Sequence, residues 1–312
     1  MPYTKLTEDF CLTSLKSLLI KATLKTISPI IANAKLEVQR SRQDFLGTIK
    51  KTPEGVISEQ TELGSIKAEW FYREEAPELP VIMYFHGGAY VTGSLLSSRV
   101  LASELAFETD FRVLSFEYRL APEHPYPAAL KDALDVYAHL LSSGIDPGDI
   151  VFAGESAGGG LLVCTALALK DENKPLPSAL ICLSPWTDLE LKGESIERNA
   201  KNDPLLTSEY LRSSAAMYAA GRSLQVPYIS PVNGELSGLP DVLIHAGSDE
   251  ILLDDARRLY EELTACGVNA TLKIFEDMWH VWHVFDIPEA HEALSGIGDF
   301  IRQKRSGGIE LT

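Results

Sequence analysis

The chain has little of what several common site types need. Only four of its 312 residues are cysteines, and none forms a CxxC pair, which argues against a zinc ribbon or a thioredoxin-type motif. No apolar stretch reaches the ~18 residues that a membrane-spanning helix requires, so no membrane insertion is expected. Basic residues are also scarce. The 28 Lys and Arg against 44 Asp and Glu give a formal net charge of −16, which repels nucleic acid.

The N-terminal apolar segment, residues 12–24, does not have the pattern of a signal peptide. Lys16 and Lys21 interrupt it, and no small-residue cleavage site follows, so we expect an amphipathic helix. Cys182 lies in an apolar run and is expected to be a buried small hydrophobe. Unpaired thiols are typical of a reducing compartment, so a cytoplasmic location is the expectation.

Short apolar runs alternate with helical patterns from about residue 55 onward. Runs of this kind suit strands buried on both faces of a parallel sheet. They lie at residues 81–85, 112–116, 150–153, 179–183, 242–246 and 271–275. A helix is expected over residues 127–141, and residues 55–58 and 66–71 predict an antiparallel pair at one edge. The fold class predicted is α/β, a doubly wound, mostly parallel sheet.

The glycine-rich sequence GESAGGG, residues 154–160, directly follows the predicted strand at 150–153. A dinucleotide site needs GxGxxG and a P-loop needs GxxxxGK, and the segment is neither. It does match GxSxG, with Ser156 in the middle, between a strand and a helix. That context is typical of a nucleophile elbow, a sharp turn that exposes the serine at the helix N-terminus. Ser156 is therefore the predicted nucleophile.

A second glycine-rich turn, His86-Gly87-Gly88-Ala89-Tyr90, follows the strand at 81–85. Loops of this type supply backbone N–H donors to the oxyanion of acyl transfer. We expect Gly87, Gly88 and Ala157 to provide those donors, with Ala89 replacing a third glycine. His86 precedes the serine in the chain, so it is expected to anchor the loop.

An acid and a base are expected after the last two strands. Asp249 comes first after the strand at 242–246 and is the predicted acid, and Glu250 is the neighbour best placed to displace it. His280 follows the strand at 271–275 and is the predicted base, with His283 as the alternative. The order Ser, Asp, His is that of the α/β hydrolases.

Assembled, these motifs resemble the hormone-sensitive-lipase-like esterases, the bacterial class IV family, over residues 50–303. Further matching motifs are YRLAPEHP at 118–125, LSPWTD at 183–188 and Ser230-Pro231. The resemblance implies an α/β-hydrolase fold with an eight-stranded sheet and a carboxylic ester hydrolase for short acyl chains. It also implies no cofactor, no metal and, often, a homodimer formed through the last strand. Glu155, where Asp is frequent, is expected to anchor the elbow.

The same resemblance implies a domain division. Residues 1–50 and the insertion 187–230 would form a helical cap over a catalytic domain of 51–186 and 231–312. Tyr90 and Trp186 are expected to line the substrate pocket, with packing in the core as the alternative. The substrate is expected to be a small ester or lactone. Lactone hydrolysis and amide hydrolysis remain alternatives because the same triad serves them. A receptor without turnover and a nucleotide-binding oxidoreductase are the more distant alternatives.

Overall fold

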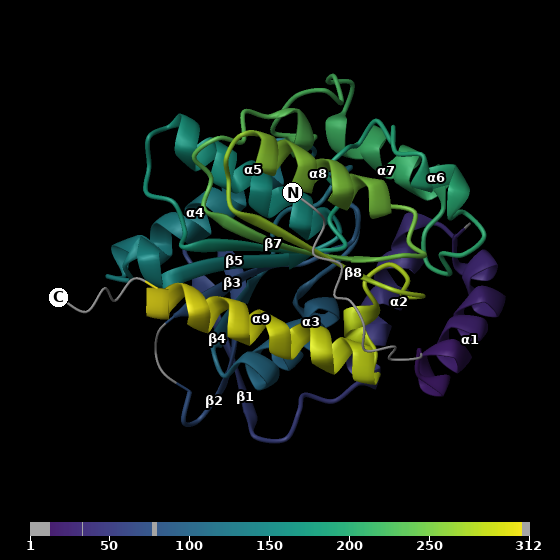
Figure 1. Cartoon of the computed structure of the whole chain (residues 1–312), viewed down its shortest axis with the longest axis horizontal. Helices are drawn as coiled ribbons and strands as arrows, with labels where there is room; N and C mark the ends of the chain where they lie inside the picture. The colour runs from purple at the N-terminus through teal and green to yellow at the C-terminus, as the bar shows by residue number, and fades with distance from the viewer. Residues whose placement is uncertain (1–12, 33, 77–79, 308–312) are drawn as a thin grey trace.

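A central sheet with helices on both faces forms the body of the protein (Figure 1). The computed structural model describes residues 13–32, 34–76 and 80–307. The sheet has eight strands in the order β1-β2-β4-β3-β5-β6-β7-β8. They are β1 Val56–Leu63, β2 Ile66–Arg73, β3 Val81–Phe85, β4 Arg112–Phe116, β5 Ile150–Glu155, β6 Ala179–Leu183, β7 Asp241–Gly247 and β8 Ala270–Phe275.

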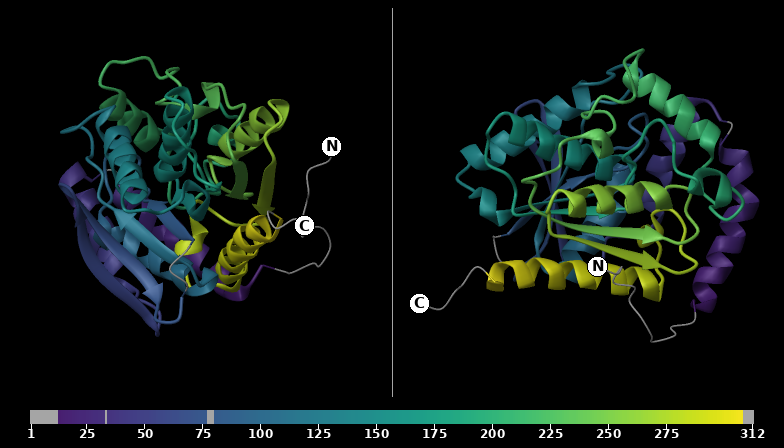
Figure 2. Two further views of the ribbon diagram at one scale, coloured as in Figure 1. Left: turned by 90° about the vertical axis from the view of Figure 1, so that its left-hand side faces the viewer. Right: turned by 45° about the horizontal axis from the view of Figure 1, so that its top comes forward.

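The strand directions confirm the predicted α/β-hydrolase fold. β1 pairs antiparallel with β2, and β2 pairs antiparallel with β4. All the other pairings, from β4 through β8, are parallel. Figure 2 shows the sheet twisting strongly from the β1–β2 edge to the β8 edge. Because parallel strands end at the same side, the turns that follow β3, β5, β7 and β8 are brought together there.

Two layers of helices bury the strands, which explains the continuous apolar runs of the sequence. On one face lie α3 Leu95–Thr109 and α9 Pro288–Gly307, whose Leu105 and Ile297 join Ile82 and Val113 in a core cluster. The helices of the opposite face and their short neighbours are α4 Ala128–Ser142, α5 Ala157–Asp171, α8 Leu253–Ala265 and the 3-10 turns η1 Pro147–Asp149 and η2 Pro231–Asn233. The expected helix at 127–141 is α4, with Pro127 as its N-cap.

The remaining helices gather beyond the carboxyl ends of the strands, at the right of Figure 1. They are α1 Leu15–Ala32, α2 Leu36–Ile49, α6 Ser195–Arg198 and α7 Ser208–Ala219. They come from the two segments that the sequence sets apart, 1–50 and 187–230. The 3-10 turn η3 Trp282–Val284 completes this side.

Within the residues described, no helix is both long and apolar enough to cross a bilayer. Cys182 is buried and free, as expected, and Cys164 and Cys266 are also free. Cys11 and residues 12 and earlier of the N-terminal segment lie outside the described residues.

Candidate active site

Ser156 sits at the tip of a turn between β5 and α5, in a segment that we call the elbow, residues 154–158. Its backbone has φ 55° and ψ −122°, a strained conformation for a residue with a side chain. The two flanking glycines make the turn possible. A Cβ on Gly158 would lie 2.0 Å from the Phe85 carbonyl oxygen, and one on Gly154 would lie 2.6 Å from it. The elbow therefore requires glycine at both positions because β3 passes directly beneath it.

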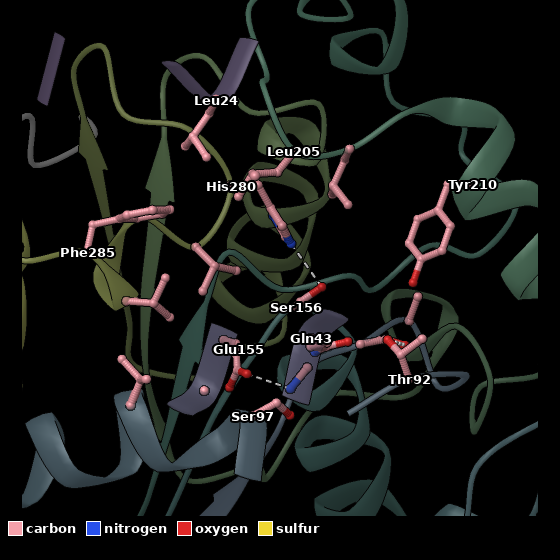
Figure 3. Close-up of a pocket in the computed structure, with 18 of the residues that line it drawn as sticks. Leu24, Gln43, Thr92, Ser97, Glu155, Ser156, Leu205, Tyr210, His280 and Phe285 are labelled. Carbon is pink, nitrogen blue, oxygen red and sulfur yellow. Dashed lines mark hydrogen bonds between the residues drawn. The ribbon is translucent and has the colours of Figure 1, made fainter. Parts of the chain in front are cut away.

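His280 reaches the serine from the turn after β8, which we call the base turn, residues 275–280. Its Nε2 lies 2.9 Å from Ser156 Oγ, as Figure 3 shows. The imidazole is only 6% exposed. Burial lowers the pKa of His280 to about 4, against the attraction of the Asp203 carboxylate. The ring is therefore neutral at pH 7 and able to accept the serine proton.

The carboxylate behind His280 belongs to Glu250, and the expectation of Asp249 is wrong in this respect. Glu250 Oε2 lies 2.9 Å from His280 Nδ1. Its other oxygen, Oε1, accepts the Gly247 N–H at 2.7 Å. Burial raises the pKa of Glu250, and hydrogen bonds from Gly247 and Ser184 oppose that rise. The neighbour that the sequence had kept as an alternative thus occupies the position of the acid.

Asp249 points elsewhere because the turn after β7 is fixed by contacts with the base turn. We call residues 247–250 the acid turn. Ser248 N–H donates to Phe275 O at 2.9 Å, and Asp249 N–H donates to Met278 O at 3.0 Å. Because the backbone is held in this way, the Asp249 side chain points toward α1, where its carboxylate binds the ammonium group of Lys21. The acid turn therefore sends one carboxylate to the histidine and the next toward the N-terminal helix.

The loop after β3 also departs from the expectation, since the Gly87 N–H is not free. It donates to Glu155 Oε1 at 2.6 Å, a bond drawn in Figure 3. The Tyr84 hydroxyl donates to the other oxygen of Glu155. Burial raises the pKa of Glu155 to about 7. Glu155 thus ties the elbow to the glycine loop, and Gly87 is an anchor of that loop, not a free donor.

The free donors of the loop lie one residue further along. Gly88 and Ala89 line the cavity beside Ser156. Within the described residues, the N–H groups of Gly88, Ala89 and Ala157 have no acceptor. Gly88 has φ 119°, where a Cβ would lie 2.2 Å from Thr92 O, and Ala89 follows with φ 53°. This left-handed turn exposes successive N–H groups, so the structure favours Gly88, Ala89 and Ala157 as the donor set. The two positive φ angles are the signal that the sequence alone does not show.

Tyr90 and Trp186 do not reach the cavity. Both are buried, at 1% and 0% exposure, and neither is among the described residues that line it. Tyr90 stacks on Tyr218 with ring centroids 3.9 Å apart and lies 6.1 Å from Trp186. The expectation that they contact substrate is therefore wrong, and packing in the core is their role in this structure.

A cavity of about 670 Å³ opens above Ser156 and His280. This volume is within the ~300–1,000 Å³ typical of small-molecule sites. Figure 3 shows Leu24 and Leu205 beside His280, Phe285 on one side, and Tyr210 pointing toward Thr92 on the other. The lining that comes from the segments 1–50 and 187–230 is Leu24, Gln43, Gly47, Lys50, Leu205, Leu206, Tyr210 and Leu211.

Two further polar residues of the 187–230 segment hold the acid turn, and no sequence motif pointed to them. Asn199 Nδ2 donates to Ser248 O at 3.0 Å and to Glu250 O at 2.9 Å. Asp203 Oδ2 accepts the Ile251 N–H at 3.0 Å, while Oδ1 accepts the Leu205 N–H at 2.9 Å. Burial raises the pKa of Asp203 to about 6. Asn199 thus holds the acid turn, and Asp203 links Leu205 of the cavity wall to Ile251, the residue after Glu250.

Two other histidines considered from the sequence, His283 and His86, have contacts that suit a structural role. His283 is fully buried, stacks near His245 and lacks a partner for either ring nitrogen among the described residues. His86 stacks on Tyr118 at 4.0 Å, with Nδ1 2.8 Å from Gly87 O, and so anchors the loop.

One group of metal-ligand-type side chains, Glu104, Glu108 and His291, has its ligand atoms within 4.8 Å of one another. His291 pairs with Glu108, and Lys50 pairs with Glu104. These contacts make the group an ion-pair network.

The sequence pattern of the α/β-hydrolase-fold family matches residues 82–284. An acetyl-hydrolase of Streptomyces hygroscopicus is 38% identical over 270 residues, which is 86% of this chain and 89% of that protein. An esterase of Acinetobacter venetianus is 37% identical over 286 residues, covering 90% of this chain and 93% of that protein.

Solved structures agree with these matches. An esterase from the bacterial hormone-sensitive lipase family superposes with a TM-score of 0.90 at 38% identity, over 94% of this chain and 99% of that one. EstE5, in crystals soaked with p-nitrophenyl butyrate, superposes with a TM-score of 0.89 at 34% identity, again over 94% and 99%.

Proposed function

We propose, from the premise that the chain belongs to the α/β-hydrolase-fold family and is an esterase of its hormone-sensitive-lipase group, that it hydrolyses short-chain carboxylic esters through Ser156, His280 and Glu250. The observation that carries the proposal is the hydrogen-bonded line from Ser156 Oγ to His280 Nε2 and from Nδ1 to Glu250 Oε2. Nucleophile, base and orienting acid stand in the geometry that acyl transfer needs.

In the proposed first step, Ser156 Oγ attacks the ester carbonyl carbon while His280 Nε2 takes the hydroxyl proton. Glu250 keeps the Nδ1–H tautomer in place and stabilises the imidazolium that forms. The tetrahedral intermediate collapses, and the alkoxide leaves with the proton from Nε2. Water then attacks the acyl carbonyl carbon and gives one proton to His280 Nε2. The second tetrahedral intermediate collapses, the bond from the acyl carbon to Ser156 Oγ breaks, and Oγ takes the proton back from Nε2 as the carboxylic acid is released.

The negative oxygen of the tetrahedral intermediate is assigned to the N–H groups of Gly88, Ala89 and Ala157. Their support is that each is without an acceptor in the described structure and that α5 directs its N-terminus toward Ser156. Such donors act only as charge develops, and loss of one typically costs ~10²–10³ in rate. The Gly87–Glu155 bond holds the loop that carries them.

Short acyl chains are supported by two of the relatives. One is named an acetyl-hydrolase, and crystals of another were soaked with p-nitrophenyl butyrate. The cavity wall is mainly apolar, with Leu24, Leu205 and Phe285 around the base. An apolar wall suits an acyl group or a small alcohol. We extend the proposal to a cap formed by 1–50 and 187–230, because both segments contribute to that wall.

The test is a ladder of p-nitrophenyl esters from acetate to palmitate, with wild type beside Ser156→Ala. We expect activity that peaks at short chains and falls by ~10⁴ or more in the variant, since the nucleophile is gone. Ser142→Ala, which removes an exposed hydroxyl bonded to His139 O, is the matched control and should be fully active. A Ser156→Ala protein with wild-type turnover would overturn the proposal. Turnover of lactones or amides alone would replace the ester by those substrates.

A further inference from the structure

The side chain of Lys21 is buried, which is unusual for a lysine. It lies in α1, and its side chain is only 11% exposed. The ammonium group binds the Asp249 carboxylate and donates to the Asp277 carbonyl oxygen at 2.8 Å. An ammonium group withdrawn from water needs partners of this kind, since desolvation of an unpaired charge is costly. Nothing in the reaction as proposed above uses Lys21 or Asp249.

The two partners of Lys21 belong to the two turns that carry the acid and the base. Asp249 immediately precedes Glu250 in the acid turn. Asp277 lies three residues before His280 in the base turn. The turns also bond to each other directly, since Asp277 N–H donates to Ser248 Oγ at 2.8 Å. Lys21 therefore spans the junction of the acid turn and the base turn from outside.

The same helix contributes to the cavity one turn further along. Leu24 lines the cavity beside His280. Ile20 and Leu24 pack against the cluster that contains Met278, Trp279 and Trp282. A shift of α1 would therefore displace both the cavity wall and the segment around His280.

We infer that Lys21 is a positioning residue, which holds the acid turn and the base turn at the separation that lets His280 meet Glu250 and Ser156 together. The inference rests on the proposed function. It assigns to the N-terminal helix an influence on the chemical step as well as on binding. It also gives Asp249 a role, which is to anchor that helix through Lys21. This role explains why a second acidic residue lies next to Glu250. Displacements of about 1 Å in a reacting group can cost ~10²-fold in rate.

The experiment measures kcat and KM for p-nitrophenyl butyrate in Lys21→Met, Lys21→Arg, Asp249→Asn and the double variant. We expect Lys21→Met to lower kcat by about 10- to 100-fold, with KM changed by less than ~3-fold. Lys21→Arg keeps the charge and should recover most of kcat. The double variant should lose no more than the worse single variant, because both changes break one contact. Lys25→Met, an exposed lysine of the same helix, is the control and should match wild type.

Full kcat in Lys21→Met, or a raised KM at unchanged kcat, would overturn the inference. If Lys21→Met fails to fold, as judged by thermal unfolding, Asp249→Asn decides by the same criteria because it keeps the shape of the side chain. Failure of the proposed function has a different signature, namely an inactive wild type or an active Ser156→Ala. An active wild type, an inactive Ser156→Ala and a fully active Lys21→Met would reject the positioning role alone.

Discussion

The elbow and the acid turn each place one side chain of the site at the end of a strand, but different contacts hold them. At the elbow, the geometry comes from the turn itself and from the two strands beside it, β3 and β6, since Leu183 O of β6 accepts the Ser156 N–H at 2.9 Å. Gly154 and Gly158 fit against Phe85, and Ser156 takes its strained backbone between them. At the acid turn, the bonds come from distant segments: from the base turn, from Asn199 and Asp203, and from Lys21.

This contrast separates a site that a short motif can encode from one that the fold must assemble. Five consecutive residues specify the elbow. The acid turn depends on residues up to 228 positions away along the chain. Changes at the two glycines of the elbow should therefore act mainly on folding, whereas changes around the acid turn should act mainly on the rate of reaction.

The largest effect is expected from Glu250→Gln. The amide keeps the size of the side chain but no longer stabilises the imidazolium, so kcat should fall by ~10³–10⁴. Steady-state kinetics with p-nitrophenyl butyrate measures this, with Asp249→Asn as the neighbouring comparison. If Asp249→Asn proved the more damaging of the two, the acid would have to be reassigned to Asp249.

Gly158→Ala tests the elbow. Its new Cβ would lie 2.0 Å from the Phe85 carbonyl oxygen, which forces β3 and α5 apart. We expect the free energy of unfolding to drop by more than ~4 kcal/mol. Gly296→Ala is the matched control, because its Cβ would meet only Lys273 Nζ at 3.4 Å inside α9. It should stabilise slightly, by ~0.5–1 kcal/mol. Equal denaturation midpoints for the two variants would show that the elbow tolerates a side chain.

Asn199→Ala probes the acid turn from the 187–230 segment. The change removes the Asn199 donor from the carbonyl oxygens of Ser248 and Glu250, of which Glu250 O still accepts the Leu253 N–H at 3.3 Å. Each lost buried hydrogen bond costs ~1–3 kcal/mol, and we expect kcat to fall by ~10-fold as Glu250 loses its position. Asn269→Ala removes an exposed bond to Asp241 and is the control. Unchanged kcat in Asn199→Ala would mean that Glu250 keeps its position without the hydrogen bonds from Asn199.

The smallest effect is expected at His291, near the start of α9. Hydrogen bonds to Asp286 and Glu108 raise the pKa of His291 above 6.5. A raised pKa means that the protonated ring stabilises the fold fully below pH 6.5 and that this stability is lost as pH rises through the folded-state pKa. Since the side chain is 43% exposed, solvent screening limits the contribution to ~1 kcal/mol or less.

His291→Gln should therefore lower the denaturation midpoint at pH 5.5 and leave it unchanged at pH 9. His139→Gln, at an exposed position in α4, is the control. A loss of stability that is the same at both pH values would assign His291 to packing instead of to charge.

The sequence predicted the sheet, the elbow and the histidine because each has a local signal. Continuous apolar runs mark strands covered on both faces, and GxSxG between a strand and a helix marks the turn. His280 is the first histidine after β8. The antiparallel β1–β2 edge was likewise confirmed. The domain division into cap and catalytic parts stays a prediction.

The predictions that failed depended on where a side chain or an N–H group points. Asp249 and Glu250 are adjacent acids, and only the contacts of the acid turn decide which one faces His280. Gly87 was predicted as an oxyanion donor, but its N–H donates to Glu155 of the elbow, so Ala89 takes its place in the donor set. Tyr90 and Trp186 follow strand ends, yet α5 and α7 cover them. Each error is a matter of one residue's orientation, set by a partner far away in the sequence.

The contacts of α1 also have a consequence for the order in which the protein can be completed. Its polar partners Asp249, Asp277, Asp286 and Glu289 all follow β7, so they are synthesised after seven of the eight strands. At translation rates of ~5–20 residues per second, α1 waits roughly 15–50 s for them. A chain still being synthesised therefore carries its serine without the helix fastened over the base, and the finished site is one of the last parts to form.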